Sequence, residues 1–374
     1  PFENHTLFLP THLGEVRVKN KVVRMSTIED FYNKEPNYEE KLHINILGVP
    51  HILGYGGLHG SEDKYSYEGE LWLLDAKQYY PNIMIQFDYL SRAVKGEKRE
   101  QFKYIVANRD AMRDIGETVK AENYKLISNT TFGASKARFN DMYDPKMANN
   151  ICISGQLMLI DLLHRLGDSV KLVQSNTDGI LVIPKDKVKI EKEVDAWEKR
   201  HNLKMDIEVF KQLYQKDVNN YISVGVDDSV TVKGGYVSQT TVNGHRPFNM
   251  RKTGKIIDDA VVNYFVNKII PEQTINSSSN KLDFQLIRKT GRTYDGTVWE
   301  NNGVDVEVNM VNRVYATKDS SMGKLYKVRE GKRDSVPSLP EHCHLANKDD
   351  FDIKNLDRQY YIDEAWRRIR DYEK

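Results

Sequence analysis

The chain has 374 residues, a length for two or more structural units rather than one small domain. Hydrophobic residues make up 39% and charged residues 29%, a composition that argues against a disordered chain. Lys and Arg number 55 against 54 acidic residues, so any basic surface must be local and offset by acid elsewhere. No stretch reaches the roughly 18 apolar residues of a membrane span, and we expect no membrane partner. Two cysteines, Cys152 and Cys343, exclude a disulfide scaffold and indicate a reducing, cytoplasmic compartment.

The first clear elements are a strand and a pair of helices. Residues 71–75 form an apolar run that ends in an acid, Asp75, and this pattern predicts a buried strand. Helical spacing then covers 98–114 and, after a short break, about 118–131, with a predicted end at Gly133. Two helices joined in this way predict a helical hairpin.

The clearest helix covers residues 146–166, and Gly167 follows its last periodic residue. Two apolar runs, 170–174 and 180–183, come next and are joined by Asn176-Thr-Asp-Gly179, which predicts a β-hairpin. The helix has six residues on one face at helical spacing, namely Ile151, Gly155, Met158, Leu159, Leu162 and Leu166.

The remaining chain has weaker patterns. A charged surface helix is predicted over 186–201, and strands over 205–210 and 218–236. Beyond about residue 240 the pattern is mixed until a final helix near 360–373. The predicted inner side of that helix carries Tyr361, Ala365, Ile369 and Tyr372.

Two acids stand where a sheet would hold them rigidly. Asp75 ends an apolar strand, and Asp178 lies at the tip of the predicted hairpin. If both acids meet on one sheet, they would bind Mg²⁺, a hard cation that takes carboxylates together with substrate phosphate oxygens. Taken singly, Asp75 is also interpretable as a strand cap and Asp178 as a turn former.

A second group of candidates is cationic. Arg109 and Arg113 are four residues apart on the first hairpin helix and share a face, while Lys125 lies on the second helix. Three cations from one hairpin could clamp a triphosphate. The alternative is a solvated helix face with ion pairs to Asp110 and Asp114.

The two groups occur in an order that resembles a known family. Asp75-Ala-Lys-Gln-Tyr-Tyr-Pro81 resembles the first polymerase motif of family B DNA polymerases. Lys125-Leu-Ile-Ser-Asn-Thr-Thr-Phe-Gly133 resembles the second motif, and Asn176-Thr-Asp-Gly179 resembles the third. Residues 47–60, 312–313 and 339–342 look like bacteriophage members of the family.

This sequence departs from the family pattern in three motif positions. Asn176 replaces the first acid of the third motif, and an amide cannot supply a carboxylate charge. Gln78 replaces a serine and Phe132 a tyrosine, changes that alter hydrogen bonding. We also expect no proofreading exonuclease on this chain, because no Asp-x-Glu precedes Asp75.

The resemblance implies a role for each matching residue at the catalytic centre. Asp75 and Asp178, with the backbone carbonyl of Ala76, would hold two Mg²⁺ ions, with Mn²⁺ as an alternative. Tyr80 would lie under the sugar of the incoming nucleotide and exclude a 2′-hydroxyl. Arg109, Arg113 and Lys125 would hold the triphosphate. Asn129 would face the nascent base pair.

The resemblance also implies two DNA-contacting groups. Tyr221, Lys233 and Gly234 would contact the primer strand. The turn Tyr55-Gly56-Gly57 loosely resembles a template-contacting turn of the family. The implied partners are primer–template DNA and dNTPs, with a separate exonuclease or processivity protein as a further candidate.

The implied architecture is an α+β polymerase right hand. The palm, built on an antiparallel sheet, would comprise residues 1–92 and 125–240, the fingers 93–124, and the thumb 241–374. The implied reaction is template-directed DNA synthesis. Two alternatives remain open: a non-catalytic primer–template-binding subunit, which Asn176 keeps open, and another palm enzyme such as a primase-polymerase.

Overall fold

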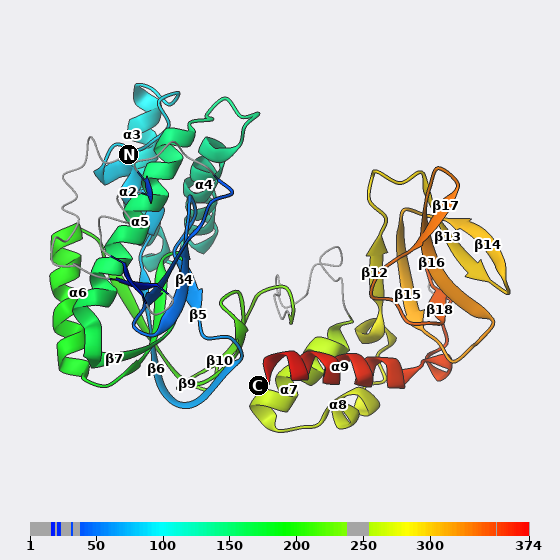
Figure 1. Ribbon diagram of the computed structural model, residues 1–374. Helices are drawn as coiled ribbons and strands as arrows, with labels where there is room; N and C mark the ends of the chain where they lie inside the picture. Colours follow the sequence, from blue (N-terminus) through cyan, green and yellow to red (C-terminus); the bar gives the residue numbers. More distant parts are fainter. Residues whose placement is uncertain are drawn as a thin grey trace. The chain divides into compact units, whose positions relative to one another are not determined.

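The computed structural model describes residues 16–18, 21–23, 31–32, 38–237, 254–348 and 350–373. These residues form two compact units (Figure 1). The first unit comprises residues up to 63, 68–212 and 225–228, and the second comprises 64–67, 213–224 and those from 229 onward. The predicted boundary between palm and thumb at residue 240 lies outside the described residues.

The first unit is built on one antiparallel sheet. Within this unit the strand order is β9-β6-β8-β7-β5-β4-β3-β1-β2, part of an eleven-stranded sheet, and every neighbouring pair from β6 to β2 is antiparallel. The strands are β1 (Val16–Val18), β2 (Lys21–Val23), β3 (Leu42–Ile46), β4 (Val49–Leu53), β5 (His59–Ser61), β6 (Tyr65–Ala76), β7 (Val170–Asn176), β8 (Gly179–Pro184) and β9 (Met205–Asp217). The strand before Asp75 and the hairpin of β7 and β8 are confirmed, and so is the expected mixture of helices and antiparallel sheet.

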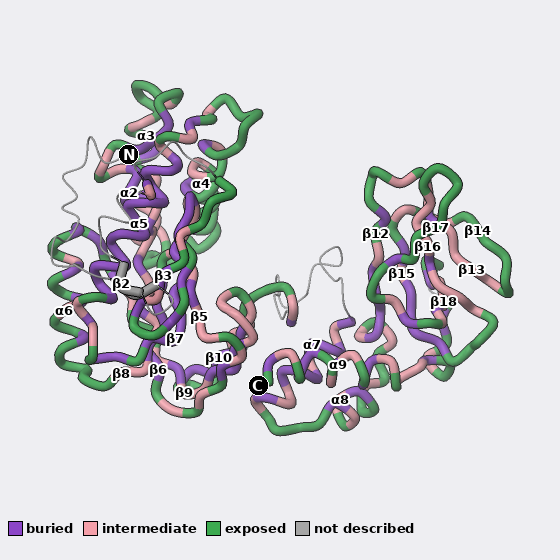
Figure 2. The backbone as a smooth tube through the Cα atoms, in the orientation of Figure 1, coloured by how far each residue is buried: buried purple, intermediate pink, exposed green. Residues whose placement is uncertain are grey.

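Helix α5 (Pro145–Leu166) forms the centre of this unit's core. Every residue from 148 to 163 is buried, so the helix is enclosed on all sides (Figure 2). The prediction of one apolar face was therefore too narrow. The other helices of the unit are α2 (Tyr79–Gln86), α3 (Glu97–Asp114), α4 (Thr118–Lys136) and α6 (Lys187–His201).

The helical hairpin of α3 and α4 is confirmed, with one corrected end. The two helices pack side by side, and α2 contacts both (Figure 1). Helix α4 continues through Gly133 to Lys136, whereas we expected it to stop at the glycine. A glycine inside a helix lowers helix stability by only about 1 kcal/mol relative to alanine. The last turn of α4 is also stabilised by a residue beyond the helix, because Asp144 N donates to Ser135 O at 2.8 Å.

The second unit contains a helical cluster and two further sheets. The final helix is confirmed, and each of its four predicted inner residues has an exposed fraction of 0%. The sheets were not predicted; their orders are β12-β15-β18 and β14-β13-β16-β17. The elements are β10 (Asn220–Gly225), β11 (Val230–Lys233), α7 (Lys255–Asn267), α8 (Pro271–Ser277), β12 (Leu286–Lys289), β13 (Gly296–Asn301), β14 (Val304–Val308), β15 (Val311–Ala316), β16 (Met322–Arg329), β17 (Lys332–Ser335), β18 (Cys343–Leu345) and α9 (Arg358–Tyr372).

Two general expectations can be compared with the described residues. Cys152 and Cys343 are both buried free thiols. None of the described helices has the length and apolar character needed to cross a membrane.

Candidate active site

The two acids predicted to act together are neighbours in the sheet. Asp75, at the end of β6, lies opposite Gly179, which directly follows Asp178. The amide of Ala76 donates to the backbone oxygen of Asp178 at 2.9 Å, and a Cβ placed on Gly179 would lie 3.0 Å from Asp75 Oδ1. Asp75 is half-buried and Asp178 is exposed. The sheet register thus places the two residues together at one end of β6 and β8.

The same row of the sheet continues across two more strands. Gly179 on β8 lies opposite Asn176 on β7, and Asn176 lies opposite His59 on β5. Asn176 is half-buried. Asn176, which replaces the first acid of the third motif, therefore lies in the same row of the sheet as Asp75 and next to the turn that carries Asp178.

The hairpin tip that carries Asp178 has an unusual backbone conformation. Thr177 has φ of +59°, and positive φ is an outlier for a β-branched residue. Three neighbours hold it: Thr177 N donates to Leu58 O at 2.8 Å, its Oγ1 is 3.2 Å from His59 Nε2, and Gly57 packs against it. Such outliers persist only where the surroundings over-determine them, and they cluster at functional sites.

The predicted template turn, Tyr55-Gly56-Gly57, is the segment that packs on this tip. Gln156, buried on α5, donates to Gly54 O at 2.7 Å and to Gly56 O at 2.6 Å. Lys136 Nζ donates to Tyr55 O at 3.0 Å. The Tyr55 ring is buried, so any DNA contact of the turn would come from the backbone at its two glycines.

We expect Gly57→Ala to destabilise the protein. A methyl group there would lie 2.5 Å from Thr177 Oγ1 and 2.9 Å from its Cβ, so either the turn or the hairpin tip must move. Overpacking of this kind costs about 1–3 kcal/mol of unfolding free energy, which urea denaturation measures. Gly56→Ala is the matched control, because nothing lies within 4 Å of a Cβ at that position. Equal stability of the two variants would disprove the tight contact.

Tyr80 lies on α2 close to the acids, and its ring is fixed on two sides. It packs on Phe132 of α4 with ring centroids 4.7 Å apart, and it stacks on Tyr79 with ring centroids 5.9 Å apart. Burial raises the pKa of Tyr80 well above its ordinary value. The neighbouring Tyr79 donates to Gly155 O at 2.6 Å, and both burial and the charge of Asp178 raise its pKa.

The residues predicted to hold the triphosphate, and Asn129, which is predicted to face the nascent base pair, lie on the α3–α4 hairpin. Arg109 is half-buried on α3, and Arg113 is exposed one turn later, 3.5 Å from Asp110. Lys125 and Asn129 are exposed one turn apart on α4, and Lys125 Nζ is 3.9 Å from Glu122. The ion pair of Arg113 with Asp110 is the one that the alternative interpretation expected. Exposed pairs of this length are weak, so they leave these cations able to bind a phosphate.

Several residues of this site carried no role in the sequence interpretation. Lys136 joins two regions, because it donates to the template turn and its Nζ lies 5.1 Å from the centre of the Phe132 ring. Burial raises the pKa of the Cys152 thiol on α5. The sequence contained no signal for these contacts, since their partners are far apart along the chain.

The three predicted primer-contacting residues are brought together in the second unit. Tyr221 on β10 lies opposite Lys233 on β11, and Gly234 follows directly. Gly234 has φ of +95°, and its backbone approaches Asn219 and Asn220 too closely for a side chain. Tyr221 is buried, whereas Lys233 is exposed. The hairpin therefore presents the lysine and the glycine backbone to solvent.

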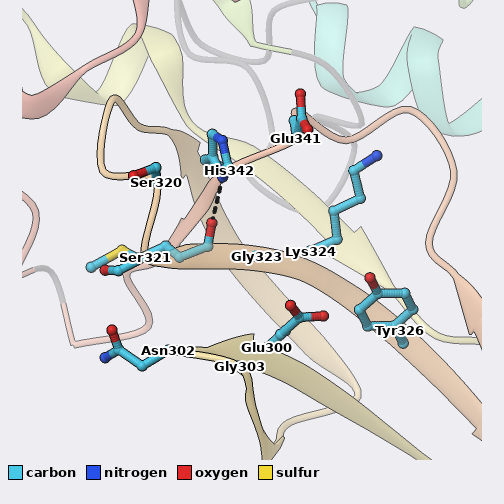
Figure 3. Close-up of a pocket in the computed structure, with 11 residues that line it drawn as sticks. Glu300, Asn302, Gly303, Ser320, Ser321, Gly323, Lys324, Tyr326, Glu341 and His342 are labelled. Atoms are coloured by element: carbon cyan, nitrogen blue, oxygen red, sulfur yellow. Dashed lines mark hydrogen bonds between the residues drawn. The ribbon is translucent and has the colours of Figure 1, made fainter.

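The second unit also contains a polar pocket of about 610 Å³ (Figure 3). Its lining includes Glu300, Lys324, Tyr326, Glu341 and His342, and His342 Nδ1 lies 2.8 Å from Met322 O. None of the predicted site residues lines this pocket.

The two neighbouring acids are compatible with a hard divalent cation. Asp75 and Asp178 supply carboxylate oxygens at one end of the sheet, which is the ligand type that Mg²⁺ prefers. In the described part of the chain, no group of three or more His, Cys, Asp or Glu side chains could hold a metal ion. Substrate oxygens and water would therefore have to complete any coordination shell.

Comparison with known proteins supports the fold rather than a family. No family model matches the sequence, and no curated protein matches it significantly. The solved structure of the family B DNA polymerase from the hyperthermophilic archaeon Pyrobaculum calidifontis matches with a TM-score of 0.51 at 12% sequence identity. The match covers 90% of this chain and 47% of that polymerase, so the chain spans about half its length. At this identity the match shows a similar, polymerase-like fold.

Proposed function

We propose that the protein catalyses template-directed DNA synthesis, in which a primer 3′-hydroxyl attacks the α-phosphate of a dNTP and pyrophosphate leaves. The observation that carries this function is the sheet register that makes Asp75 and Asp178 neighbours, in a chain with a polymerase-like fold. Two carboxylates at one end of an antiparallel sheet suit nucleotidyl transfer, because this chemistry depends on positioning and charge stabilisation.

Each residue group has a role in this reaction. Divalent metal ions, when bound by Asp75 and Asp178, would activate the attacking hydroxyl and stabilise the leaving oxygen. The Tyr80 ring would support the sugar, and Arg109 with Arg113 would neutralise the triphosphate. The strand pairing of His59, Asn176, Gly179 and Asp75 would keep both acids in place, whichever of the four nucleotides is bound.

The proposed right-hand architecture follows from these roles. The sheet of the first unit would be the palm, and the α3–α4 hairpin would be the fingers that deliver the cations. The β10–β11 hairpin, with Lys233 and the exposed backbone of Gly234, would hold primer phosphates. Contacts to phosphates suit an enzyme that must accept any sequence. The thumb would lie within the remainder of the second unit.

Asn176 is the specific observation that favours a second candidate, a non-catalytic primer–template-binding subunit. It stands in the row of the two carboxylates but carries no charge. Incubation with primer–template, Mg²⁺ and a labelled dNTP separates the two candidates. Incorporation of label supports synthesis, whereas tight DNA binding without incorporation supports the binding subunit. RNA template and rNTP arms of the assay identify a different palm enzyme.

Sugar selection provides a prediction for Tyr80. Its ring packs on Phe132 and stacks on Tyr79, so its bulk would lie in a fixed place under the nucleotide sugar. We expect Tyr80→Ala to raise rNTP incorporation relative to dNTP by about ten- to a hundredfold, the usual discrimination of a steric pocket. Tyr80→Phe keeps the ring and should retain the parental ratio. An unchanged ratio in Tyr80→Ala would remove this residue from the sugar site.

A further inference from the structure

Gln78 connects the strand end that carries Asp75 to the fingers hairpin. It directly precedes α2, and its backbone is left-handed, with φ of 47° and ψ of 44°. Positive φ is uncommon for residues other than glycine, so this backbone must be stabilised by the residue's surroundings. Its own backbone oxygen accepts from Asn82 N at 2.9 Å, within the first turn of α2.

The side chain of Gln78 reaches across to α3. Its Nε2 donates to the backbone oxygen of Val106 at 3.2 Å and to Asp110 Oδ2 at 3.3 Å. Both partners are acceptors, so the amide nitrogen must be the atom that faces them. Val106 is buried in the core of the unit, and the other oxygen of Asp110 lies 3.5 Å from Arg113. A continuous chain of contacts therefore runs from Gln78, three residues after Asp75, through Asp110 to Arg113.

The remaining atom of the amide shows that packing alone does not explain this residue. Gln78 Oε1 is buried and has no hydrogen-bond partner. Leaving a buried acceptor unsatisfied is unfavourable, and native structures keep few such groups. The unsatisfied Oε1 makes glutamine an unfavourable residue at this position. We therefore attribute its presence to the two hydrogen bonds that its Nε2 donates to α3.

We propose that Gln78 is a positioning residue that fixes α3, and with it Arg109 and Arg113, relative to the strand end that carries Asp75. This role rests on the proposed function. We call the two hydrogen bonds from Gln78 to α3 the tie. Asp110 precedes Arg113 by one turn and directly follows Arg109 in the sequence, so a shift of α3 at Gln78 moves both cations. A small misplacement of positioning groups is enough to reduce the rate of group transfer.

Two variants exchange the donor and the acceptor in the hydrogen bond between Gln78 and Asp110. Gln78→Glu places a carboxylate against Asp110 and the Val106 oxygen, so the tie becomes repulsive. We expect the KM for dNTP to rise about tenfold, the usual scale for coupled neighbours, with kcat changed less and primer–template affinity unchanged. In the double variant Gln78→Glu/Asp110→Asn, the new amide can donate to the glutamate, and KM should return to near the parental value.

Two further variants serve as comparisons. Gln101→Glu adds the same charge on an exposed position of α3 and should leave KM unchanged. Gln78→Met keeps the length of the side chain but cannot donate, and it should raise KM about threefold by the same reasoning. This variant also tests the tie if the buried glutamate prevents folding.

Hydrogen exchange provides a readout that does not depend on catalysis. In the free protein, amides of α3 should exchange faster in Gln78→Glu and return to parental rates in the double variant. If the parental protein adds no nucleotide, the proposed function fails, while this exchange result still supports or refutes the tie. Parental KM and parental exchange rates in both Gln78→Glu and Gln78→Met, or no rescue by Asp110→Asn, would overturn the positioning role.

Discussion

Replacement of Asp178 by asparagine is expected to slow nucleotide addition about a thousandfold while leaving primer–template affinity almost unchanged. The substitution keeps the size of the side chain at the hairpin tip but removes a carboxylate charge next to Asp75. Loss of about 4 kcal/mol of transition-state stabilisation corresponds to a rate reduction of roughly a thousandfold. Asp75→Asn should have the same effect. Single-turnover primer extension in Mg²⁺ measures both variants.

Two comparisons make this prediction specific. Asp168→Asn removes an exposed acid that has no assigned role and should extend primers at the parental rate. Asn176→Ala should lose far less activity than Asp178→Asn, because an amide is a weak metal ligand. A loss in Asn176→Ala equal to that in Asp178→Asn would assign the amide a direct role. Parental rates in either aspartate variant would refute the metal site.

The second large effect is expected in the fingers hairpin. Arg109→Ala or Arg113→Ala should raise the KM for dNTP, lower kcat, or both, while barely changing affinity for primer–template. Each charge-assisted hydrogen bond to a phosphate contributes about 1.5–3 kcal/mol, or about ten- to a hundredfold in kcat/KM. Both residues lie on one face of α3 within a turn, so their effects should not be independent.

The alternative is that this hairpin is a DNA-binding surface. In that case the same variants would weaken DNA affinity and reduce its salt dependence by about 0.9 for each phosphate that the protein no longer neutralises. DNA titrations at two salt concentrations, run beside steady-state kinetics in dNTP, separate the two. Lys98→Ala, on an exposed position of the same helix, is the control for a general loss of positive charge. A DNA-affinity defect with parental nucleotide kinetics would refute the triphosphate clamp.

Local sequence patterns predicted the elements of the first unit from β6 onward, apart from α2, but not strands β1 to β5. The strand before Asp75 and the β7–β8 hairpin depend on apolar runs and turn residues that are visible within a few positions. Helix α5 was located correctly, but the spacing of its apolar residues predicted only one buried face, whereas every residue from 148 to 163 is buried. Buried polar residues such as Gln156 use their side chains on distant partners instead.

Contacts between distant segments were the part that the sequence could not predict. Gly57 packs on Thr177, and Gln78 reaches Asp110, through spatial neighbours that no spacing rule encodes. The two sheets of the second unit were also missed. Strand β14 does alternate apolar and polar residues, as Val-Asp-Val-Glu-Val, but this run of five residues was overlooked in a region of mixed pattern.

Single-nucleotide addition on four primer–templates that differ only in the templating base tests the central claim most directly. With Mg²⁺ and each dNTP in turn, the parental protein should add only the complementary nucleotide on each template. Asp178→Asn should add it about a thousandfold more slowly, although it binds the same DNA. Parental protein that binds DNA but adds no nucleotide, addition that ignores the templating base, or parental rates in Asp178→Asn would contradict template-directed synthesis at these two acids.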